Sequence, residues 1–249
     1  MPTLRGLDVE AHLRDPELKQ RFVTPMFDII APRYDRFTRL FSFGMDRRWK
    51  ANMLAQIRAF ARPDNVVLDL ACGTGDLALD LSGIASRGRV TGLDVSGGMI
   101  AEARRRAVAS GDRRVLFEVG DMTQLAAADA SVDLITAGYG FRNVPDASSA
   151  LREVARVLRP GGRLLTLDFY RPENPLWRHA LVRYLSVAGN LVGWLWHREP
   201  VVYGYIAHSV EHWMSWQAFG RALESAGLDV ERVDRMLLGG AAIHRARRR

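Results

Sequence analysis

Three aspartates stand at or beside the ends of three successive predicted strands. Residues 66–70 form an apolar run that contains Asp69 and is typical of a parallel strand buried on both faces. Asp94 ends the next predicted strand, and Asp121 ends the third. The carboxyl ends of parallel strands meet at one edge of a sheet, where open α/β sheets bind their ligands. The three acids therefore predict a single ligand site at that edge.

The turn after the first strand, residues 71–76, would let a ligand approach the backbone. Gly73 and Gly75 permit a sharp turn and place no Cβ in the way of a ligand. With Ala78 they also satisfy the dinucleotide pattern G-x-G-x-x-A. The turn alone therefore leaves a nicotinamide-dependent enzyme open as an alternative.

The chemistry of the acids favours a different cofactor. Asp69 would repel a pyrophosphate but would attract an ammonium group. Asp94 is suited to bridge two ribose hydroxyls, a feature that dinucleotide enzymes share. Asp121 could accept a hydrogen bond from the exocyclic amine of adenine while Met122 packs on the ring. An ammonium, a ribose and an adenine together indicate S-adenosylmethionine, a donor of methyl groups.

The pattern along the chain predicts an α/β fold with a doubly wound, mostly parallel sheet. Five predicted strands, 66–70, 89–94, 115–121, 133–139 and 163–169, alternate with helices at 76–82, 98–110 and 147–158. A helix at 216–226 precedes two strands, 230–237 and 241–246. The short turn through Gly239 and Gly240 makes these last two strands antiparallel.

Two further parts of the chain complete the expected domain organisation. Residues 1–62 form an N-terminal helical cap, and 63–249 form the cofactor-binding domain. In the cap, Thr24 is expected as a helix N-cap with Pro25 as the first helical residue, Pro32 ends that helix, and a second helix covers 47–60. Residues 170–214 are interpreted as an irregular insertion after the fifth strand, lying over the ligand site.

The composition limits the cell compartment and the partners. The single cysteine, Cys72, excludes an internal disulfide, and neither a secretion signal, a bilayer-spanning run nor a metal-ligand cluster is found. We therefore expect a cytoplasmic protein without a metal. The net charge of +7 comes from arginine, since Lys19 and Lys50 are the only lysines. These arginines are either solvated on outer faces or attract an anionic surface, which would allow peripheral contact with the inner face of a membrane.

The chain resembles the class I methyltransferases, and more narrowly the ubiquinone/menaquinone biosynthesis C-methyltransferase family, from about Phe27 to His244. The resemblance implies a seven-stranded sheet with an antiparallel last strand, and a prenylated quinol as the methyl acceptor. By position, cofactor contacts fall on Thr74, Asp94, Asp121 and Met122, with Gly138 where the family has a serine. Asp69, Gly73, Gly75 and Met99 complete the expected cofactor site. The motifs that carry the resemblance are residues 30–35, 44–50, 68–76, 140–144, 150–153 and 157–164.

The methylation of a ring carbon also suggests catalytic residues. Ionisation of a neighbouring phenol makes the ring carbon nucleophilic, so a cation and a base are needed near the oxygen. Arg142 could stabilise the phenolate and Asn143 could orient it; alternatively, Arg142 forms an ion pair that holds its loop. Tyr34 could close the site or anchor the cap. His208, which stands where the family has a glutamate, is the expected base, and its alternative is a surface histidine.

The part of the chain expected to bind the substrate departs further from the family's sequence motifs than the part expected to bind the cofactor. The family's Leu-Pro-Phe after the third strand is absent, and residues 211–215 are unusual. A methyltransferase of a soluble aromatic or secondary metabolite is therefore a second hypothesis. A cofactor-binding regulatory or RNA-modifying protein is a third, although no nucleic-acid motif supports it. We expect a small aromatic acceptor, no nucleic acid, and a chain compatible with a homodimer.

Overall fold

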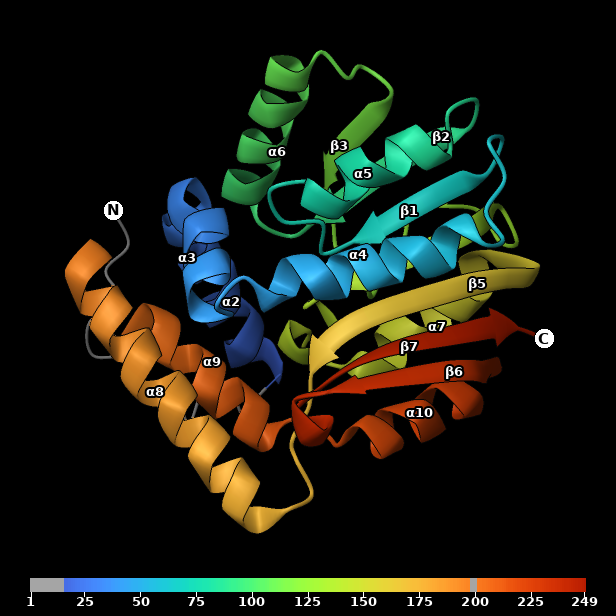
Figure 1. Ribbon diagram of the computed structural model, residues 1–249. Coiled ribbons are helices and arrows are strands. Elements are labelled where there is room, and N and C mark those ends of the chain that lie inside the picture. The colour runs from blue at the N-terminus through green and yellow to red at the C-terminus, as the bar shows by residue number, and fades with distance from the viewer. Residues whose placement is uncertain (1–15, 198–200) are drawn as a thin grey trace.

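The computed structural model describes residues 16–197 and 201–249 and contains one seven-stranded sheet of order β3-β2-β1-β4-β5-β7-β6 (Figure 1). The first five strands run parallel, and β7 pairs antiparallel with both β5 and β6. This confirms the predicted fold class and the antiparallel end. The strands are β1 (Val66–Leu70), β2 (Arg89–Asp94), β3 (Val115–Val119), β4 (Val132–Gly138), β5 (Leu158–Phe169), β6 (Leu228–Met236) and β7 (Ala241–Arg248).

Helices cover both faces of the sheet, and each face has its own apolar core. On one face, Met53 and Ile57 pack with Leu134 and Leu165 of the strands. On the opposite face, Leu151 and other apolar side chains pack against the same strands. The helices of these layers are α4 (Met45–Arg58), α5 (Asp76–Ile84), α6 (Gly97–Ser110), α7 (Ala147–Val157) and α10 (Trp216–Ser225).

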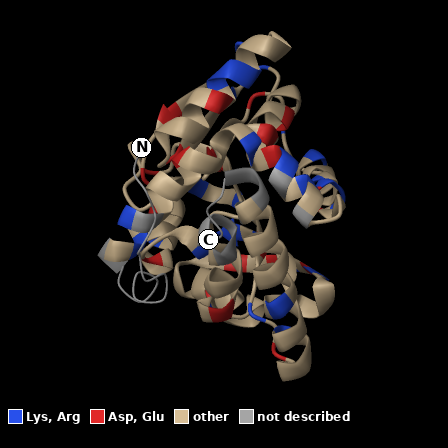
Figure 2. Cartoon of the chain, turned by 90° about the vertical axis from the view of Figure 1, so that its left-hand side faces the viewer, with Lys and Arg blue, Asp and Glu red and all other residues tan. Residues whose placement is uncertain are grey.

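Four more helices lie beyond the carboxyl ends of the parallel strands (Figure 1). They are α2 (Pro16–Ile30), α3 (Tyr34–Phe41), α8 (Pro175–His197) and α9 (Val201–His212). They share a third apolar cluster that includes Met26, Leu185 and Tyr205. Long stretches of the helices on this side carry no charged residue (Figure 2). Within the described residues, no helix is long and apolar enough to cross a bilayer.

Two predictions about these helices were wrong. Helix α2 begins at Pro16, so Thr24 is not its N-cap and Pro25 lies inside it. The burial of Val23, Met26 and Ile30 offsets the hydrogen bond that Pro25 cannot make. The segment 170–214 is not irregular, because α8 and α9 fill most of it. Helix α8 is apolar around much of its circumference, which hides the helical period in the sequence.

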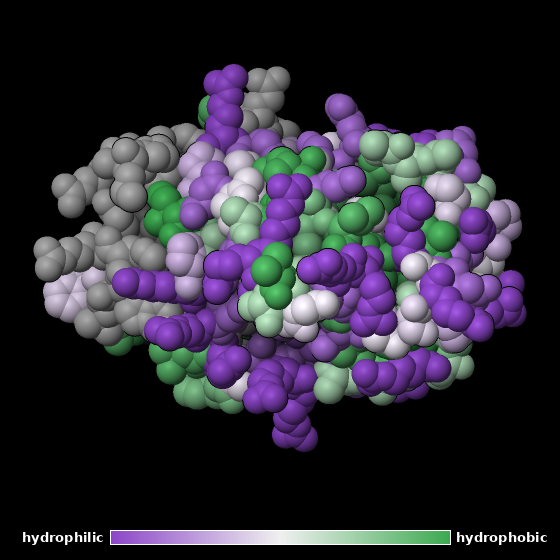
Figure 3. All heavy atoms as spheres, turned by 90° about the horizontal axis from the view of Figure 1, so that it is seen from above, coloured by the Kyte–Doolittle hydropathy of each residue, from purple (hydrophilic) through white to green (hydrophobic). Residues whose placement is uncertain are grey.

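The face formed by α5, α6 and β3 differs from the helical side. Seen from above, its apolar side chains are interrupted by hydrophilic ones (Figure 3). Its exposed apolar residues include Val108 on α6 and Val119 on β3. Single exposed apolar residues of this kind are normal on protein surfaces. This surface, formed by α5, α6 and β3, is the reference face for the helical side.

Candidate functional site

The glycine turn between β1 and α5 has the backbone that the sequence predicted. Gly73 and Gly75 have φ angles of +54° and +81°, in the left-handed region that favours glycine. A Cβ on Gly75 would lie 2.6 Å from the ring of Phe117, so no side chain fits there. The predicted turn is confirmed, and its close packing explains the need for glycine at position 75.

Asp94 ends β2 and holds the turn in place. Its Oδ2 accepts a hydrogen bond from the Gly73 N–H at 2.9 Å, and its Oδ1 accepts one from the Ser96 N–H at 2.9 Å. Burial raises the pKa of Asp94. Each carboxylate oxygen has a second lone pair, which leaves capacity to accept from two further hydroxyl donors.

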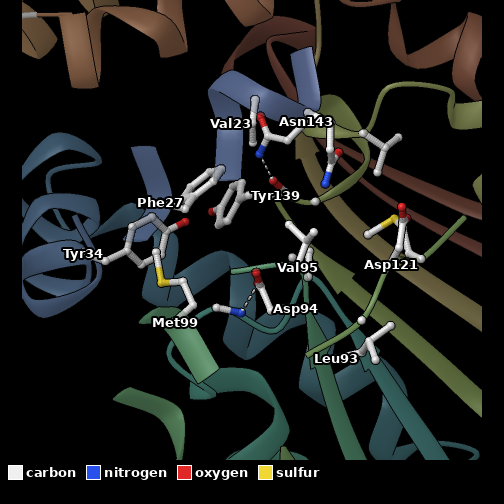
Figure 4. Close-up of a pocket in the computed structure, with 18 residues that line it drawn as sticks. Val23, Phe27, Tyr34, Leu93, Asp94, Val95, Met99, Asp121, Tyr139 and Asn143 are labelled. Carbon is white, nitrogen blue, oxygen red and sulfur yellow. Dashed lines mark hydrogen bonds between the residues drawn. The ribbon is translucent and has the colours of Figure 1, made fainter. Parts of the chain in front are cut away.

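A cavity of about 70 Å³ opens beside Asp94 (Figure 4). Phe27, Tyr34 and Tyr139 gather on one side of it, with Asp94 below them and Asp121 opposite. Asp121 Oδ1 accepts from both the N–H and the hydroxyl of Thr123, which fixes the carboxylate. Of the predicted site residues, those that line this cavity are Tyr34, Gly73, Asp94, Met99, Asp121, Met122, Gly138 and Asn143.

A second cavity, of about 450 Å³, adjoins the first. Asp69 and Thr74 line it. The two cavities share the wall formed by Tyr34, Ala71, Gly73, Gly138 and Tyr139. Gly75 lines neither cavity and acts only through the shape of the turn.

Asp69 lies inside β1 and is only 1% exposed. Its Oδ1 accepts from the Thr136 hydroxyl at 2.7 Å, whereas Oδ2 has no hydrogen-bond partner of good geometry among the described residues. Burial raises the pKa of Asp69 to about 7. A buried carboxylate oxygen without a hydrogen-bond partner is costly, and a positively charged ligand group would relieve that cost.

The N-terminal cap is fixed to the glycine turn through Asp35. Its Oδ1 accepts from the Thr74 hydroxyl at 2.7 Å, and its Oδ2 lies 2.8 Å from Nη1 of Arg106. Asp35 thus anchors the cap, while the neighbouring Tyr34 forms part of both cavity walls. Of the two roles weighed for Tyr34, anchoring of the cap therefore falls to Asp35, whereas Tyr34 lies at the site.

Arg142 lies behind the cavities, not in their walls. It is 5% exposed, and its Nη1 is 2.5 Å from Oδ1 of Asp168 at the end of β5. Its Nε donates to the Ser209 hydroxyl at 2.9 Å. The guanidinium also faces the ring of Phe169 at 5.7 Å. This is the ion-pair arrangement that the sequence left open for Arg142.

Asn143 and His208 differ in where they lie. Asn143 lines the smaller cavity; its Nδ2 donates to the Tyr139 carbonyl at 2.9 Å, and its Oδ1 accepts from the Tyr205 hydroxyl at 3.2 Å. His208 is exposed on α9 and lines neither cavity. The structure thus brings Tyr34 and Asn143 to the site and leaves His208 outside it.

Sequence reasoning missed several residues of the site. Gln20, Val23 and Phe27 of α2 line the smaller cavity, which the misplaced helix start concealed. Lys19 donates from Nζ to the carbonyls of Arg142 and Val144 at 2.9 and 2.7 Å, and burial lowers its pKa to about 8. The rarity of lysine was the available signal, because Lys50 lines the larger cavity and Lys19 bonds the loop that borders the smaller one.

The arrangement fits S-adenosylmethionine. Asp94 offers acceptors for a ribose, Asp121 and Met122 suit an adenine, and the unpartnered Oδ2 of Asp69 suits an ammonium. The fold and this site define a class I methyltransferase that depends on S-adenosylmethionine. A solved structure described as a SAM dependent methyltransferase from Aquifex aeolicus shares the fold, with a TM-score of 0.56 over 79% of this chain and 88% of that one, at 21% identity.

The sequence comparisons are more specific. The chain belongs to the ubiE/COQ5 methyltransferase family, whose model matches residues 16–248. It is 40% identical to a demethylmenaquinone methyltransferase of Thermus thermophilus, over 88% of this chain and 98% of the relative. It is 34% identical to the ubiquinone/menaquinone biosynthesis C-methyltransferase UbiE of Geotalea daltonii, over 89% of this chain and 94% of the relative. The expected family, enzyme class and cofactor are confirmed.

Proposed function

We propose that this enzyme methylates a ring carbon of a reduced, lipid-tailed quinone. The family match over residues 16–248 carries the proposal, because relatives across that length are named for demethylmenaquinone and for C-methylation in quinone biosynthesis. The aromatic side chains that line the smaller cavity support it. Phe27, Tyr34 and Tyr139 offer an apolar surface against which a flat ring can pack.

The reaction requires the reduced ring. S-adenosylmethionine supplies a methyl group already activated on a sulfonium sulfur. The protein therefore mainly aligns the acceptor and favours its phenolate form. Tyr34 and Asn143 lie at the cavity and can position the ring and its oxygen. The phenol must give up its proton to form the phenolate, and the ring carbon that gains the methyl then loses its own proton. His208, expected as the base near the phenol oxygen, lies outside both cavities.

Arg142 acts on this site through its neighbours. Its charge is balanced by Asp168, and its backbone carbonyl accepts from Lys19 of α2. Through these contacts Arg142 joins β5, α9 and α2 around the loop that bears Asn143. We assign it as a positioning residue for Asn143.

The outer face of α8 is the proposed contact with a membrane that holds the lipid-tailed acceptor. Leu181 and Leu185 lie on the buried face of α8, yet its outer face is apolar as well. A ring of Phe43, from the turn before α4, stacks on Tyr184 at 5.9 Å and widens this apolar face. The exposed apolar residues of α8 include Tyr184, Val187, Leu191 and Trp194, at the 3–4 spacing of one helical face.

Charge on the neighbouring helices fits an anionic lipid surface. Arg36 and Arg39 of α3 and Arg47 and Arg48 of α4 are exposed beside the Phe43 turn. Basic residues near an apolar helix face favour reversible binding to anionic membranes. Vesicle sedimentation tests this: replacing Val187 and Trp194 by serine should lower binding to anionic vesicles about tenfold. Serine at Val108 and Val119, which are exposed on the reference face, should change nothing.

Labelling of lipid extracts tests the proposed acceptor. Enzyme, reductant and methyl-labelled cofactor are incubated with a bacterial lipid extract, and the products are analysed by mass spectrometry. A labelled quinol is the expected result. Label that appears only in a water-soluble fraction would favour a soluble aromatic acceptor and would contradict the proposal.

A further inference from the structure

The methyl group is expected at the wall that the two cavities share. Asp94 and Asp121, which suit the ribose and the adenine, line only the smaller cavity, whereas Asp69, which suits the ammonium, lines only the larger one. The sulfonium sulfur joins these two ends of the cofactor, so the sulfur and its methyl group belong at the junction. An acceptor that takes the methyl group must therefore meet the shared wall.

Tyr139 presents an unused hydrogen-bond donor at this wall. Its hydroxyl is buried and has no hydrogen-bond partner among the described residues, and a buried hydroxyl without a partner is costly. Its ring gathers with Phe27 and Tyr34 (Figure 4) and stacks on Phe169, with the ring centroids 5.4 Å apart. Its φ of +61° is uncommon for a residue with a side chain, and such strain often marks a functional site. These features favour a hydroxyl that binds a ligand.

Asp46 brings a carboxylate to the larger cavity from the first turn of α4. It is 5% exposed and lines this cavity together with Tyr139. Its Oδ1 accepts from the Ser42 hydroxyl at 2.7 Å, which fixes the carboxylate, and its Oδ2 is 4.0 Å from Nζ of Lys50, too far for a hydrogen bond. Burial first, and then the negative charge of Asp46, raise the pKa of Tyr139, so the hydroxyl stays protonated beside this carboxylate.

The other acids that line the larger cavity are less suited to take up a proton at the shared wall. Asp35 and Asp76 are both ion-paired with Arg106, at 2.8 and 2.9 Å, and such pairing favours the charged form of a carboxylate. Asp69 faces the expected ammonium of the cofactor, and Asp80 is exposed on α5. The carboxylate on α4 is therefore the best placed to act as a base.

We propose that Asp46 takes the phenol proton of the acceptor, and that the Tyr139 hydroxyl donates a hydrogen bond to the phenolate oxygen. This inference rests on the proposed function and names the groups that act on the acceptor. The two residues fill the roles first expected of His208 and Arg142, which line neither cavity. Asp46 becomes neutral as the phenolate forms, so two negative charges never face each other.

The proton and electron movements balance over one turnover. The O–H bond of the phenol breaks, and its proton moves to a carboxylate oxygen of Asp46. The ring carbon then bonds to the methyl group, while the C–S bond breaks and leaves its electron pair on sulfur. The methylated ring carbon loses its proton to water, which restores the aromatic ring, and Asp46 returns its proton to the oxygen. One proton is released for each methyl group transferred.

Turnover of a short-tailed reduced quinone and binding of S-adenosylhomocysteine, measured separately, test the two roles. For Asp46→Asn, which can keep the Ser42 hydrogen bond, we expect kcat to fall about a hundred-fold or more, with affinity for S-adenosylhomocysteine within about twofold in calorimetry. Tyr139→Phe keeps the stacked ring and should lower kcat about ten- to a hundred-fold, with affinity equally preserved. Asp80→Asn makes the same change at an exposed acid of the same cavity and should alter neither quantity.

The wild-type enzyme separates this inference from the proposed function. A wild type that binds S-adenosylhomocysteine but methylates no reduced quinone would overturn the proposed function, and the inference with it. If the wild type methylates the quinone, wild-type turnover in Asp46→Asn would overturn the base role, and wild-type turnover in Tyr139→Phe would overturn the donor role. A loss of turnover matched by an equal loss of cofactor affinity would overturn the role of the residue concerned.

Discussion

The carboxylate of Asp168 holds Arg142 in a pair that is nearly fully buried, with Nη1 and Oδ1 2.5 Å apart. The second oxygen of Asp168 accepts from the backbone N–H of Arg142 at 3.1 Å. One carboxylate therefore fixes both the main chain and the side chain of the loop that precedes Asn143. This buried pair therefore fixes the geometry of the site from a position outside the cavity walls.

Removing Asp168 should destabilise the fold strongly. Asp168→Asn leaves the Arg142 charge buried without its counter-ion, so we expect the free energy of unfolding to fall by about 3–5 kcal/mol in urea titrations. Asp229→Asn breaks the exposed pair with Arg249 and should have almost no effect. Equal stability of Asp168→Asn and the wild type would show that the pair contributes little.

Asp94 should be essential for cofactor binding. Asp94→Ala removes the proposed ribose contact and also frees the Gly73 N–H, so we expect cofactor affinity to fall at least about a hundred-fold in calorimetry. Asp64→Ala, at an exposed loop position, is the control. Retention of wild-type affinity in Asp94→Ala would remove Asp94 from the site.

Asp69 should make the ligand-free protein less stable as the pH rises. Because its pKa in the folded state is about 7, the folded chain binds more protons than the unfolded chain between about pH 4 and 7. The contribution of Asp69 to the free energy of unfolding should therefore fall across that window, by up to about 1.4 kcal/mol per pH unit, while His244 contributes a slope of opposite sign below pH 6.5. Asp69→Asn removes the Asp69 contribution, so the difference in the free energy of unfolding between the variant and the wild type should change with pH in denaturation measured at several pH values. A difference that stays constant with pH would contradict the assignment.

His244 should have the opposite effect to Asp69 on the pH dependence of stability. Its Nε2 donates to the Trp216 carbonyl at 2.9 Å, and its Nδ1 accepts from the Tyr170 hydroxyl at 3.2 Å. Burial lowers its pKa to about 4, so the stability that His244 contributes is lost as the pH falls from 6.5 towards 4. His244→Gln removes the titrating group, so in thermal melts the variant should lose less stability than the wild type over that range. An equal response of the two proteins to acid would point to other groups.

The base role of His208 has a direct kinetic test. His208 is exposed and lines neither cavity, so we expect His208→Ala to keep turnover within about twofold across the pH range. A loss of about a hundred-fold or more, with a changed pH profile, would show that His208 reaches the acceptor. His212→Ala, on the same exposed face of α9, is the matched control.

The sequence was sufficient for the sheet and for the cofactor acids, and insufficient for the cap. Apolar runs and glycine turns mark β1 to β5, and the acids at strand ends converge because parallel strands share one edge. Helix α8 was missed because both of its faces are apolar and leave no period to read. The partner of Arg142 was missed because Asp168 lies on β5, 26 residues further along the chain.

Lys50 shows the same limit at the cofactor site. Its partner, Asp76, is on a different helix, and nothing near Lys50 in the sequence indicates a cavity. The sequence marks the two lysines only as exceptions among the arginines. Their positions at the cavities follow from the tertiary packing of α2 and α4.

Methyl transfer from methyl-labelled S-adenosylmethionine to a short-tailed demethylmenaquinone, measured with and without a reductant, decides whether the enzyme methylates a ring carbon of a reduced quinone. We predict a new carbon–carbon bond on the ring, formed by the reduced acceptor only, because only its phenolate is nucleophilic enough. Mass spectrometry and carbon NMR locate the label. The account would be contradicted by a label on oxygen, by equal transfer without reductant, or by no transfer from an enzyme that binds its cofactor.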